Sequence, residues 1–172
     1  MYDMVIAYEP AVRFAAFLGV FAVVAGWEAL APRRTRRFTR RERWPHNLGL
    51  LALDVVLLRV VAPGAAVGVA LAGETHGWGL LHALALPSGA QLMLAVVLLD
   101  LAVWAQHRMF HRMPLLWRLH RMHHADLDID VTTGLRFHPL ELALSMVIKV
   151  AVVLLIGAPA LAVLAFEVLL NA

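Results

Sequence analysis

Apolar and polar residues of this chain are grouped in long blocks. Apolar blocks cover Phe14–Ala31, a stretch from Leu48 that is interrupted near Pro63 and Gly64, Gln91–Gln106, and Leu142–Leu170. The eighteen residues of the first block rise about 1.5 Å each, or roughly 27 Å, and with their flanks they cross a hydrocarbon core of about 30 Å. The pattern predicts an all-α integral membrane bundle with about three to four spans.

Composition agrees with a membrane protein and limits the chemistry. Hydrophobic residues make up 62% of the chain, against about 45–50% in soluble proteins. Cysteine is absent, which excludes disulfides and thiolate metal sites, so a metal site must use nitrogen or oxygen ligands. The excess of positive charge is confined to one part of the chain. It therefore informs on how the chain is oriented in the membrane, and no nucleic-acid partner is expected.

The positive charge is concentrated in PRRTRRFTRRERW, Pro32–Trp44, directly after the first span. Such a run marks the cytoplasmic side of a membrane and attracts anionic lipid headgroups. Counted from this run, the second span leaves the cytoplasm and the third returns. The chain after Gln106 is therefore expected on the cytoplasmic side.

The blocks predict one membrane domain over residues 1–172. Its parts are a first span (1–31), a basic cytoplasmic loop (32–46), spans two and three (47–106), a histidine-rich helical region (107–141) and a C-terminal apolar hairpin (142–172) with its break at Gly157–Pro159. In the second span, Asp54 and Arg59 are five residues apart, about 140° around a helix. Each is expected to find another partner.

Five of the nine histidines lie between His107 and His124, in HRMFHRMPLLWRLHRMHH. Within HRMFH and HRMHH their spacings of three and four place each set on one helix face, and Pro114 favours a break between two helices. Five imidazoles at one point suggest two metal ions or an incomplete ligand set, since one zinc needs three or four ligands. The alternative is a basic amphipathic surface segment, because arginines separate the histidines. His76 and His82 are expected to be interfacial or loop residues.

HRMFH and HRMHH resemble the HxxxH and HxxHH boxes of the fatty acid hydroxylase/sterol desaturase superfamily, integral membrane oxygenases with a histidine-rich di-iron centre. The neighbourhood is similar too: Asp100 precedes the first box, PLLWRLH joins the boxes, and DVTTGLRFHPLE follows the second. The resemblance covers the chain from about Pro32 onward.

The resemblance implies roles for individual residues. The iron ligands, for two iron ions in a complete site, would be His107, His111, His120, His123 and His124. Asp100 would orient His107 by a hydrogen bond, the alternative being a salt bridge with a neighbouring arginine. His138 would be a ligand or a supporting residue, and Arg136 and Glu141 would form a charged pair below the site.

The resemblance also implies a reaction, namely O2-dependent hydroxylation or desaturation of a lipid or sterol C–H bond, without a choice between the two. The partners would be the lipid or sterol substrate, dioxygen, an unidentified electron donor and membrane lipids. The family carries a third HxxHH box, and no histidine follows His138 here, so the chain is expected to be a fragment or a truncated product. The alternatives are a catalytically inactive membrane protein that binds metal and a scaffold that binds anionic lipid.

Overall fold

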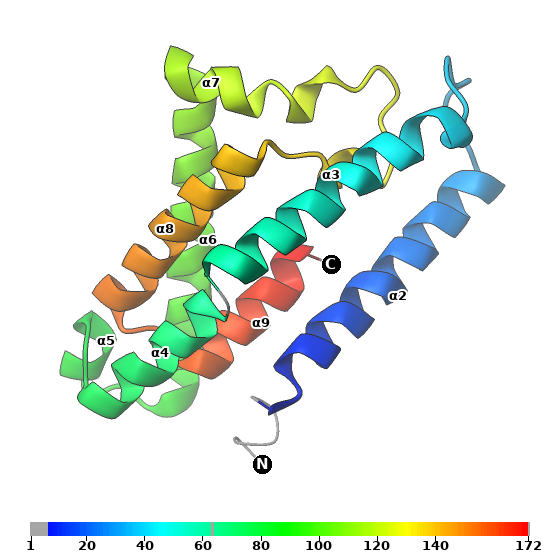
Figure 1. The fold of residues 1–172 in the computed structure, drawn as a ribbon. Helices are drawn as coiled ribbons and strands as arrows, with labels where there is room; N and C mark the ends of the chain where they lie inside the picture. Colours follow the sequence, from blue (N-terminus) through cyan, green and yellow to red (C-terminus); the bar gives the residue numbers. More distant parts are fainter. Residues whose placement is uncertain (1–6, 63, 172) are drawn as a thin grey trace. The chain divides into compact units, whose positions relative to one another are not determined.

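The fold is all-α in the computed structural model, which describes residues 7–62 and 64–171 (Figure 1). The elements are α2 (Glu9–Leu30), α3 (Arg40–Val61), α4 (Ala65–His76), α5 (Leu80–Ala83), α6 (Ser88–Arg112), α7 (Pro114–His120), α8 (Pro139–Ile156) and α9 (Ala160–Asn171), with the short 3-10 helices η1 (His123–Ala125) and η2 (Thr133–Leu135). No strand occurs among these residues, and the predicted fold class is confirmed.

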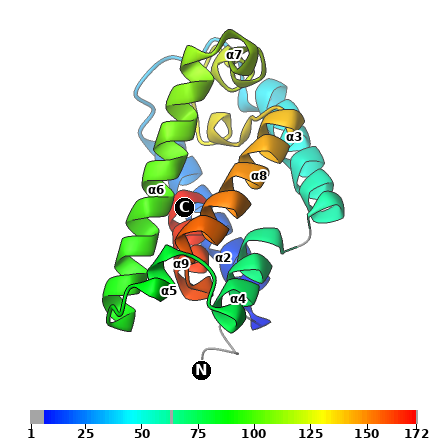
Figure 2. The ribbon, with the colours of Figure 1, turned by 90° about the vertical axis from the view of Figure 1, so that its left-hand side faces the viewer.

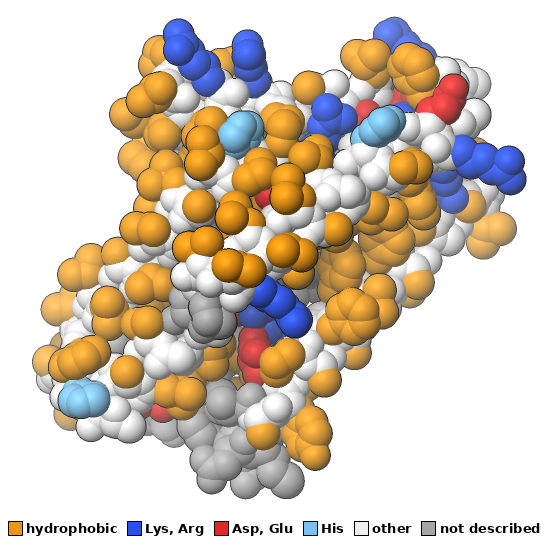
Figure 3. Space-filling view, in the orientation of Figure 1, with side chains coloured by type: hydrophobic (Ala, Val, Ile, Leu, Met, Phe, Trp, Pro, Cys, Tyr) orange, Lys and Arg blue, Asp and Glu red, His pale blue; other side chains and the backbone are white. Residues whose placement is uncertain are grey.

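Within the described residues, four segments are long and apolar enough to cross a membrane: Glu9–Leu30, Arg40–Ala83, Ser88–Arg112 and Pro139–Ile156. This number agrees with the predicted three to four spans. Many large apolar side chains are exposed on these helices, and they cover much of the visible surface in Figure 3. Such a surface suits contact with lipid tails. The predicted interruption at Pro63 lies outside the described residues.

Local signals explain where the helices begin and end. Thr39 precedes α3, and Glu42 accepts hydrogen bonds from its backbone N–H (2.7 Å) and its hydroxyl (2.9 Å), so α3 begins inside the arginine-rich segment. The predicted break before Pro114 is confirmed, with the proline in the first turn of α7. The predicted break after α8 is confirmed as well: Gly157 has φ +66°, the left-handed conformation that ends many helices.

The chain forms two compact units. Unit 1 comprises Met1–Leu18, Gly64–His107 and Ser145–Ala172, and unit 2 comprises Gly19–Pro63 and Arg108–Leu144. Of the four boundaries between the units, three fall inside α2, α6 and α8, and the fourth lies between Pro63 and Gly64.

Unit 1 has an apolar core of small and branched side chains. Its fully buried members include Ala95, Leu99, Val153, Ala160 and Val163. Within this unit α4 packs against α9, as both ribbon views show (Figures 1 and 2). The small residues of α9 allow this close packing, and the Ala160 backbone N–H donates a hydrogen bond to Oε1 of Glu74 in α4 at 2.9 Å.

The buried side of α3, in unit 2, is polar. Its buried residues are Arg43, Asn47 and Asp54. Arg43 and Asn47 bind the loop that follows η1, whereas neither carboxylate oxygen of Asp54 has a hydrogen-bond partner among the described residues. The expectation that Asp54 finds another partner is therefore wrong within the described part of the chain. Arg59 is exposed on the same helix.

Candidate metal centre

Four histidines bring their ring nitrogens together. They are His107 and His111 of α6, His120 of α7 and His124 of η1, and one ligand nitrogen from each lies within 4.8 Å of all the others. We call these four residues the histidine cluster. The ring centroids of His111, His120 and His124 are 4.8–4.9 Å apart. Three or four imidazoles around one point form a donor set for a transition metal such as zinc or iron.

The first box lies on a regular helix. His107 and His111 are one turn apart on α6, which continues without interruption to Arg112, so both side chains lie on one face. Their place was predictable from the spacing alone. The position of His107 relative to His111 follows from the continuity of this helix.

The second box differs from the expected helix. The α-helical conformation ends at His120, and His123 and His124 lie in the separate 3-10 helix η1 after a turn. The physical reason is in the following loop, where Asp126 and Asp130 bind Arg43 of α3. These contacts direct the chain away from α7 and bring His124 to the cluster.

His120 is the buried member of the cluster, with 1% of its surface exposed. Its Nδ1 lies 2.6 Å from Oε1 of Glu141. An ionised carboxylate only accepts hydrogen bonds, so Nδ1–H donates to Glu141 and the lone pair on Nε2 is left for the cluster. That Nε2 lies 3.2 Å from Nε2 of His124, and two nitrogens aimed at each other suit a shared cation. The residues therefore fit a metal ion.

Burial, together with the nearby rings of His124 and His111, lowers the pKa of the His120 imidazole to about 4. The ring is therefore neutral at physiological pH. A neutral imidazole is the form that binds a metal.

Two aromatic side chains that were not predicted as part of the site lie beside the rings of the cluster, of which only that of His120 is buried. The ring of Trp117 lies 5.4 Å from that of His111 and 5.6 Å from that of His124, and Phe110 lies 5.6 Å from His120. The spacing carried a usable signal, since Trp117 precedes His120 by three residues on the same helix and so shares its face.

The remaining predicted residues lie around the cluster. The ring of His123 stacks on Phe137 at 4.7 Å, and its centroid lies 5.0 Å from that of His124. Nδ1 of His138 accepts a hydrogen bond from the Leu140 backbone N–H at 3.1 Å, at the start of α8. Asp100 is exposed on α6, two helical turns, roughly 10 Å, before His107.

Arg136 and Glu141, expected as a charged pair, bind different partners in the described chain. Glu141 accepts the hydrogen bond from His120, and Arg136 donates to Oδ1 of Asn47 at 3.4 Å. Glu141 is therefore the residue that orients a cluster histidine. Arg136 connects the segment before α8 to α3.

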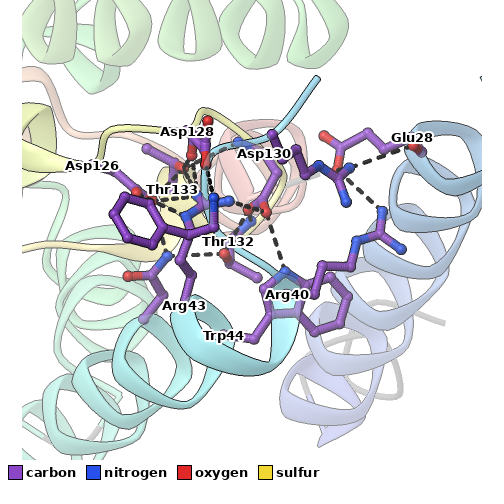
Figure 4. A network of polar contacts seen from close by, with 12 residues as sticks. Glu28, Arg40, Arg43, Trp44, Asp126, Asp128, Asp130, Thr132 and Thr133 are labelled. Atoms are coloured by element: carbon purple, nitrogen blue, oxygen red, sulfur yellow. Dashed lines mark hydrogen bonds and ion pairs between the residues drawn. The ribbon is translucent and has the colours of Figure 1, made fainter. Parts of the chain in front are cut away.

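A buried ion-pair network holds the loop after the second box (Figure 4). The Arg43 guanidinium donates to both oxygens of Asp126, at 2.9 and 2.6 Å, and to Oδ2 of Asp130 at 2.8 Å. It also donates to the backbone carbonyl of Asp128. The bidentate contact fixes both distance and orientation. The sequence did not predict this role of Arg43, because the partners lie more than eighty residues apart.

The network satisfies its carboxylates fully. Burial would raise the pKa of Asp130, but hydrogen bonds from Thr132 and Trp44 and the charge of Arg43 lower it below the ordinary value. Burial likewise opposes the ionisation of Asp126, and its hydrogen bonds from Arg43, Thr133 and Asn47 lower its pKa. Both carboxylates are ionised at neutral pH, and the Arg43 guanidinium is their counter-charge.

Comparison with known protein families identifies the region that contains the cluster. Residues 92–172 match the family model described as fatty acid hydroxylase. Over this segment, slightly less than half of the chain, the sequence is similar to the fatty acid hydroxylase family. The predicted resemblance is thereby confirmed. No curated protein and no solved structure matches the chain.

The matched segment contains all members of the histidine cluster as well as His123 and His138. The match supports a membrane-embedded function of the lipid hydroxylase type. Arg43 and Asp54 of α3 precede the matched segment. The family match therefore gives no information about these two residues.

Proposed function

We propose that this chain is a membrane-bound di-iron oxygenase that hydroxylates or desaturates a C–H bond of a lipid or sterol. The observation that carries the proposal is the convergence of four histidine nitrogens within 4.8 Å, with His120 oriented by Glu141. Imidazole is a common ligand of iron. The match of residues 92–172 to the fatty acid hydroxylase family supports the lipid substrate.

The chain's own residues would hold and tune the metal. The histidine cluster offers neutral nitrogen ligands, and His123 is the fifth proposed ligand, for which its ring would turn away from Phe137. Glu141 keeps the hydrogen of His120 on Nδ1, so Nε2 stays available for coordination. Trp117 and Phe110 limit the access of water on their side of the rings. Bound iron would supply the activation of dioxygen that an unreactive C–H bond requires.

The proposed reaction needs partners outside the chain. In hydroxylation, one atom of O2 enters the C–H bond and the other leaves as water, which consumes two electrons and two protons. An unidentified electron donor would supply the electrons, and the lipid or sterol would enter from the bilayer. The arginine-rich segment supports a cytoplasmic position for the cluster, where a donor could reach it. Two iron ions are proposed for the complete centre.

The function is tested with the purified full chain in lipid vesicles, supplied with iron, a reductant and a lipid extract under oxygen. Mass spectrometry should detect lipids that gain one oxygen or lose a pair of hydrogens, and labelled O2 should enter the hydroxylated product. The His111→Ala variant should form neither product. Equal product from wild type and His111→Ala, or none from iron-loaded wild type, would count against the proposal.

A second candidate function is the binding of anionic lipid headgroups by the arginine-rich segment. A cavity of about 500 Å³ is lined by Glu28, Ala29, Pro32 and the residues from Arg33 to Arg36. Arg33 and Arg34 are exposed there, and such side chains attract anionic lipid. Binding to vesicles that contain anionic lipid, lost in Arg33→Gln/Arg34→Gln while metal content stays unchanged, would support this role.

A further inference from the structure

A cavity of unit 1 lies apart from the histidine cluster. Its volume is about 390 Å³, its polar lining residues are Glu74, His82, Ser88 and Gln91, and the rest of its wall is apolar. These residues belong to α4, α5 and α6, whose lining parts lie at the same end of the unit as the start of α9 (Figures 1 and 2). Gln91 and His107 are sixteen residues apart on α6, roughly 24 Å along the helix, so the cavity is a separate site.

The size and the wall of this cavity suit part of a lipid. Small-molecule sites have volumes of about 300–1,000 Å³ and are mostly apolar, with a few polar groups that select the ligand. The apolar lining residues here are Leu92, Pro159 and Leu161. A lipid tail can lie against them, and the polar residues then decide which head group is accepted.

Glu74 places a carboxylate at the cavity. Its Oε1 accepts a hydrogen bond at 2.9 Å from the backbone N–H of Ala160, the first residue of α9. None of the described lining residues is an arginine or a lysine. A ligand with a carboxylate or phosphate head would therefore meet a like charge in apolar surroundings, which is unfavourable. The cavity selects against acidic lipids.

Gln91 offers the cavity a hydrogen-bond acceptor. Its Nε2 donates to the backbone carbonyl of Leu81 at 3.1 Å. A carbonyl can only accept, so this contact decides which end of the amide is nitrogen and leaves Oε1 on the other side. A head group that donates a hydrogen bond can use this oxygen.

His82 supplies a donor. Its Nδ1 is buried without a hydrogen-bond partner among the described residues, and a Cβ added to Gly157 would lie 2.6 Å from this nitrogen. A buried N–H without an acceptor is costly, so the ring hydrogen belongs on Nε2. The cavity therefore combines acceptors on Glu74 and Gln91 with a donor on His82. An alcohol hydroxyl, which both donates and accepts, matches this set.

We propose that this cavity binds an uncharged lipid through a hydroxyl head group, with the tail against the apolar wall. The hydroxyl would donate to Gln91 or Glu74 and accept from His82. No residue of the histidine cluster takes part, so the inference goes beyond the proposed function and does not rest on it.

The test uses dodecanol that carries a photoreactive diazirine on its tail, added to the purified full chain in lipid nanodiscs. After irradiation, mass spectrometry should find a saturable label on residues that line the cavity. Unlabelled dodecanol should displace the probe, whereas dodecanoate, at alkaline pH where it is ionised, should require at least about a tenfold higher concentration.

Two variants and a control test the assignment. Glu74→Gln keeps an oxygen for the Ala160 N–H and removes the charge, so dodecanoate should compete almost as well as dodecanol. Leu161→Trp fills the cavity and should lose most of the label. Leu169→Trp, at a position of the same helix that is 68% exposed, is the matched control and should be labelled like wild type.

The proposal is overturned if the wild-type label is not saturable, if it lies away from the cavity, or if dodecanol and dodecanoate displace it equally. Equal labelling of Leu161→Trp and Leu169→Trp would overturn it as well. The wild-type competition decides the matter even if a variant does not fold, and the helical signal in circular dichroism identifies that case.

Discussion

Glu141 fixes the orientation of His120, because its Oε1 accepts the Nδ1–H hydrogen bond at 2.6 Å where both side chains are buried. The contact joins the first turn of α8 to the last residue of α7. A metal ligand with its other nitrogen held by a carboxylate is both oriented and made more basic. The histidine cluster therefore depends on a residue outside both histidine boxes.

Changes at Glu141 should weaken metal binding in graded fashion. Glu141→Gln keeps an oxygen that can accept from Nδ1 but loses the charge, and iron affinity should fall about tenfold; Glu141→Leu removes the acceptor and should cost about a hundredfold. Iron titration of the purified chain against a competing chelator measures both. Equal affinity in Glu141→Leu and wild type would show that His120 is not a ligand.

Histidine substitutions should separate the cluster from the remaining histidines. His111→Ala and His124→Ala should each lose most of the bound iron, because each removes one of the four converging nitrogens. His76→Ala and His82→Ala should retain it. His123→Ala tests the fifth proposed ligand: a loss as large as in His124→Ala would mean that its ring leaves Phe137 to bind metal. Iron per chain, measured after gel filtration, gives the answer, and equal losses at all five positions would indicate general destabilisation.

The helix faces that follow from regular spacing, and the helix ends at proline and glycine, were predictable from the sequence. Pro114 and Gly157 act on their own backbone, and the spacing of His107 and His111 sets their shared face, so local rules were sufficient. The second box departed from its spacing because Asp126 and Asp130 bind Arg43, more than eighty residues away. A single sequence displays these charges but does not pair them.

Tertiary packing also explains why the partners of other polar residues were not predicted. Arg136 and Glu141 are five residues apart and of opposite charge, yet they bind Asn47 and His120. Asp54 has two unsatisfied oxygens although charged residues are frequent in the chain. Partner choice is decided by tertiary packing, which hydrophobic periodicity does not encode.

The Arg43 network should make stability depend on pH through Asp130. Its folded-state pKa lies below the ordinary value of 3.8, so the ionised carboxylate stabilises the fold above about pH 4 and loses this effect as the pH falls through the folded-state pKa. Asp130→Asn should lower the free energy of unfolding by about 1–3 kcal/mol at pH 7, and the difference from wild type should shrink in acid. Unfolding in detergent, followed by circular dichroism between pH 7 and pH 3, tests this. A difference that does not change with pH would contradict the assignment.

Arg43 should not be replaceable by lysine. A lysine has no planar fork, so it cannot make the paired contacts to Asp126 and also reach Asp130. Arg43→Lys should destabilise the chain by about 2 kcal/mol or more and loosen the loop that follows η1, the 3-10 helix that contains His124. Arg59→Lys, at an exposed position of the same helix, is the matched control and should unfold like wild type. Thermal unfolding in one detergent compares them.

The close approach of Gly79 to Gly157 should tolerate no side chain. A Cβ on Gly79 would lie 2.2 Å from the backbone nitrogen of Gly157, and Gly79 has φ +94°, so Gly79→Ala adds a backbone clash to a strained conformation. We expect a loss of at least about 2 kcal/mol in unfolding free energy. Gly89→Ala, where a Cβ meets nothing within 4 Å, should have little effect. Similar unfolding temperatures of the two variants would argue against this contact.

The proposed topology predicts which positions face the cytoplasm. The chain has no cysteine, so a single introduced cysteine is the only site for a thiol reagent. Arg34→Cys lies in the arginine-rich segment and Arg121→Cys between His120 and η1, and both positions are exposed. Because positively charged loops stay on the cytoplasmic side, both should resist a membrane-impermeant maleimide in intact cells and react after lysis. Thr75→Cys, exposed near the end of α4, should react in intact cells because the crossing count puts it outside. If Arg121→Cys is labelled in intact cells while Arg34→Cys is protected, the histidine cluster does not share a side with the arginines, and a cytoplasmic electron donor could not reach it.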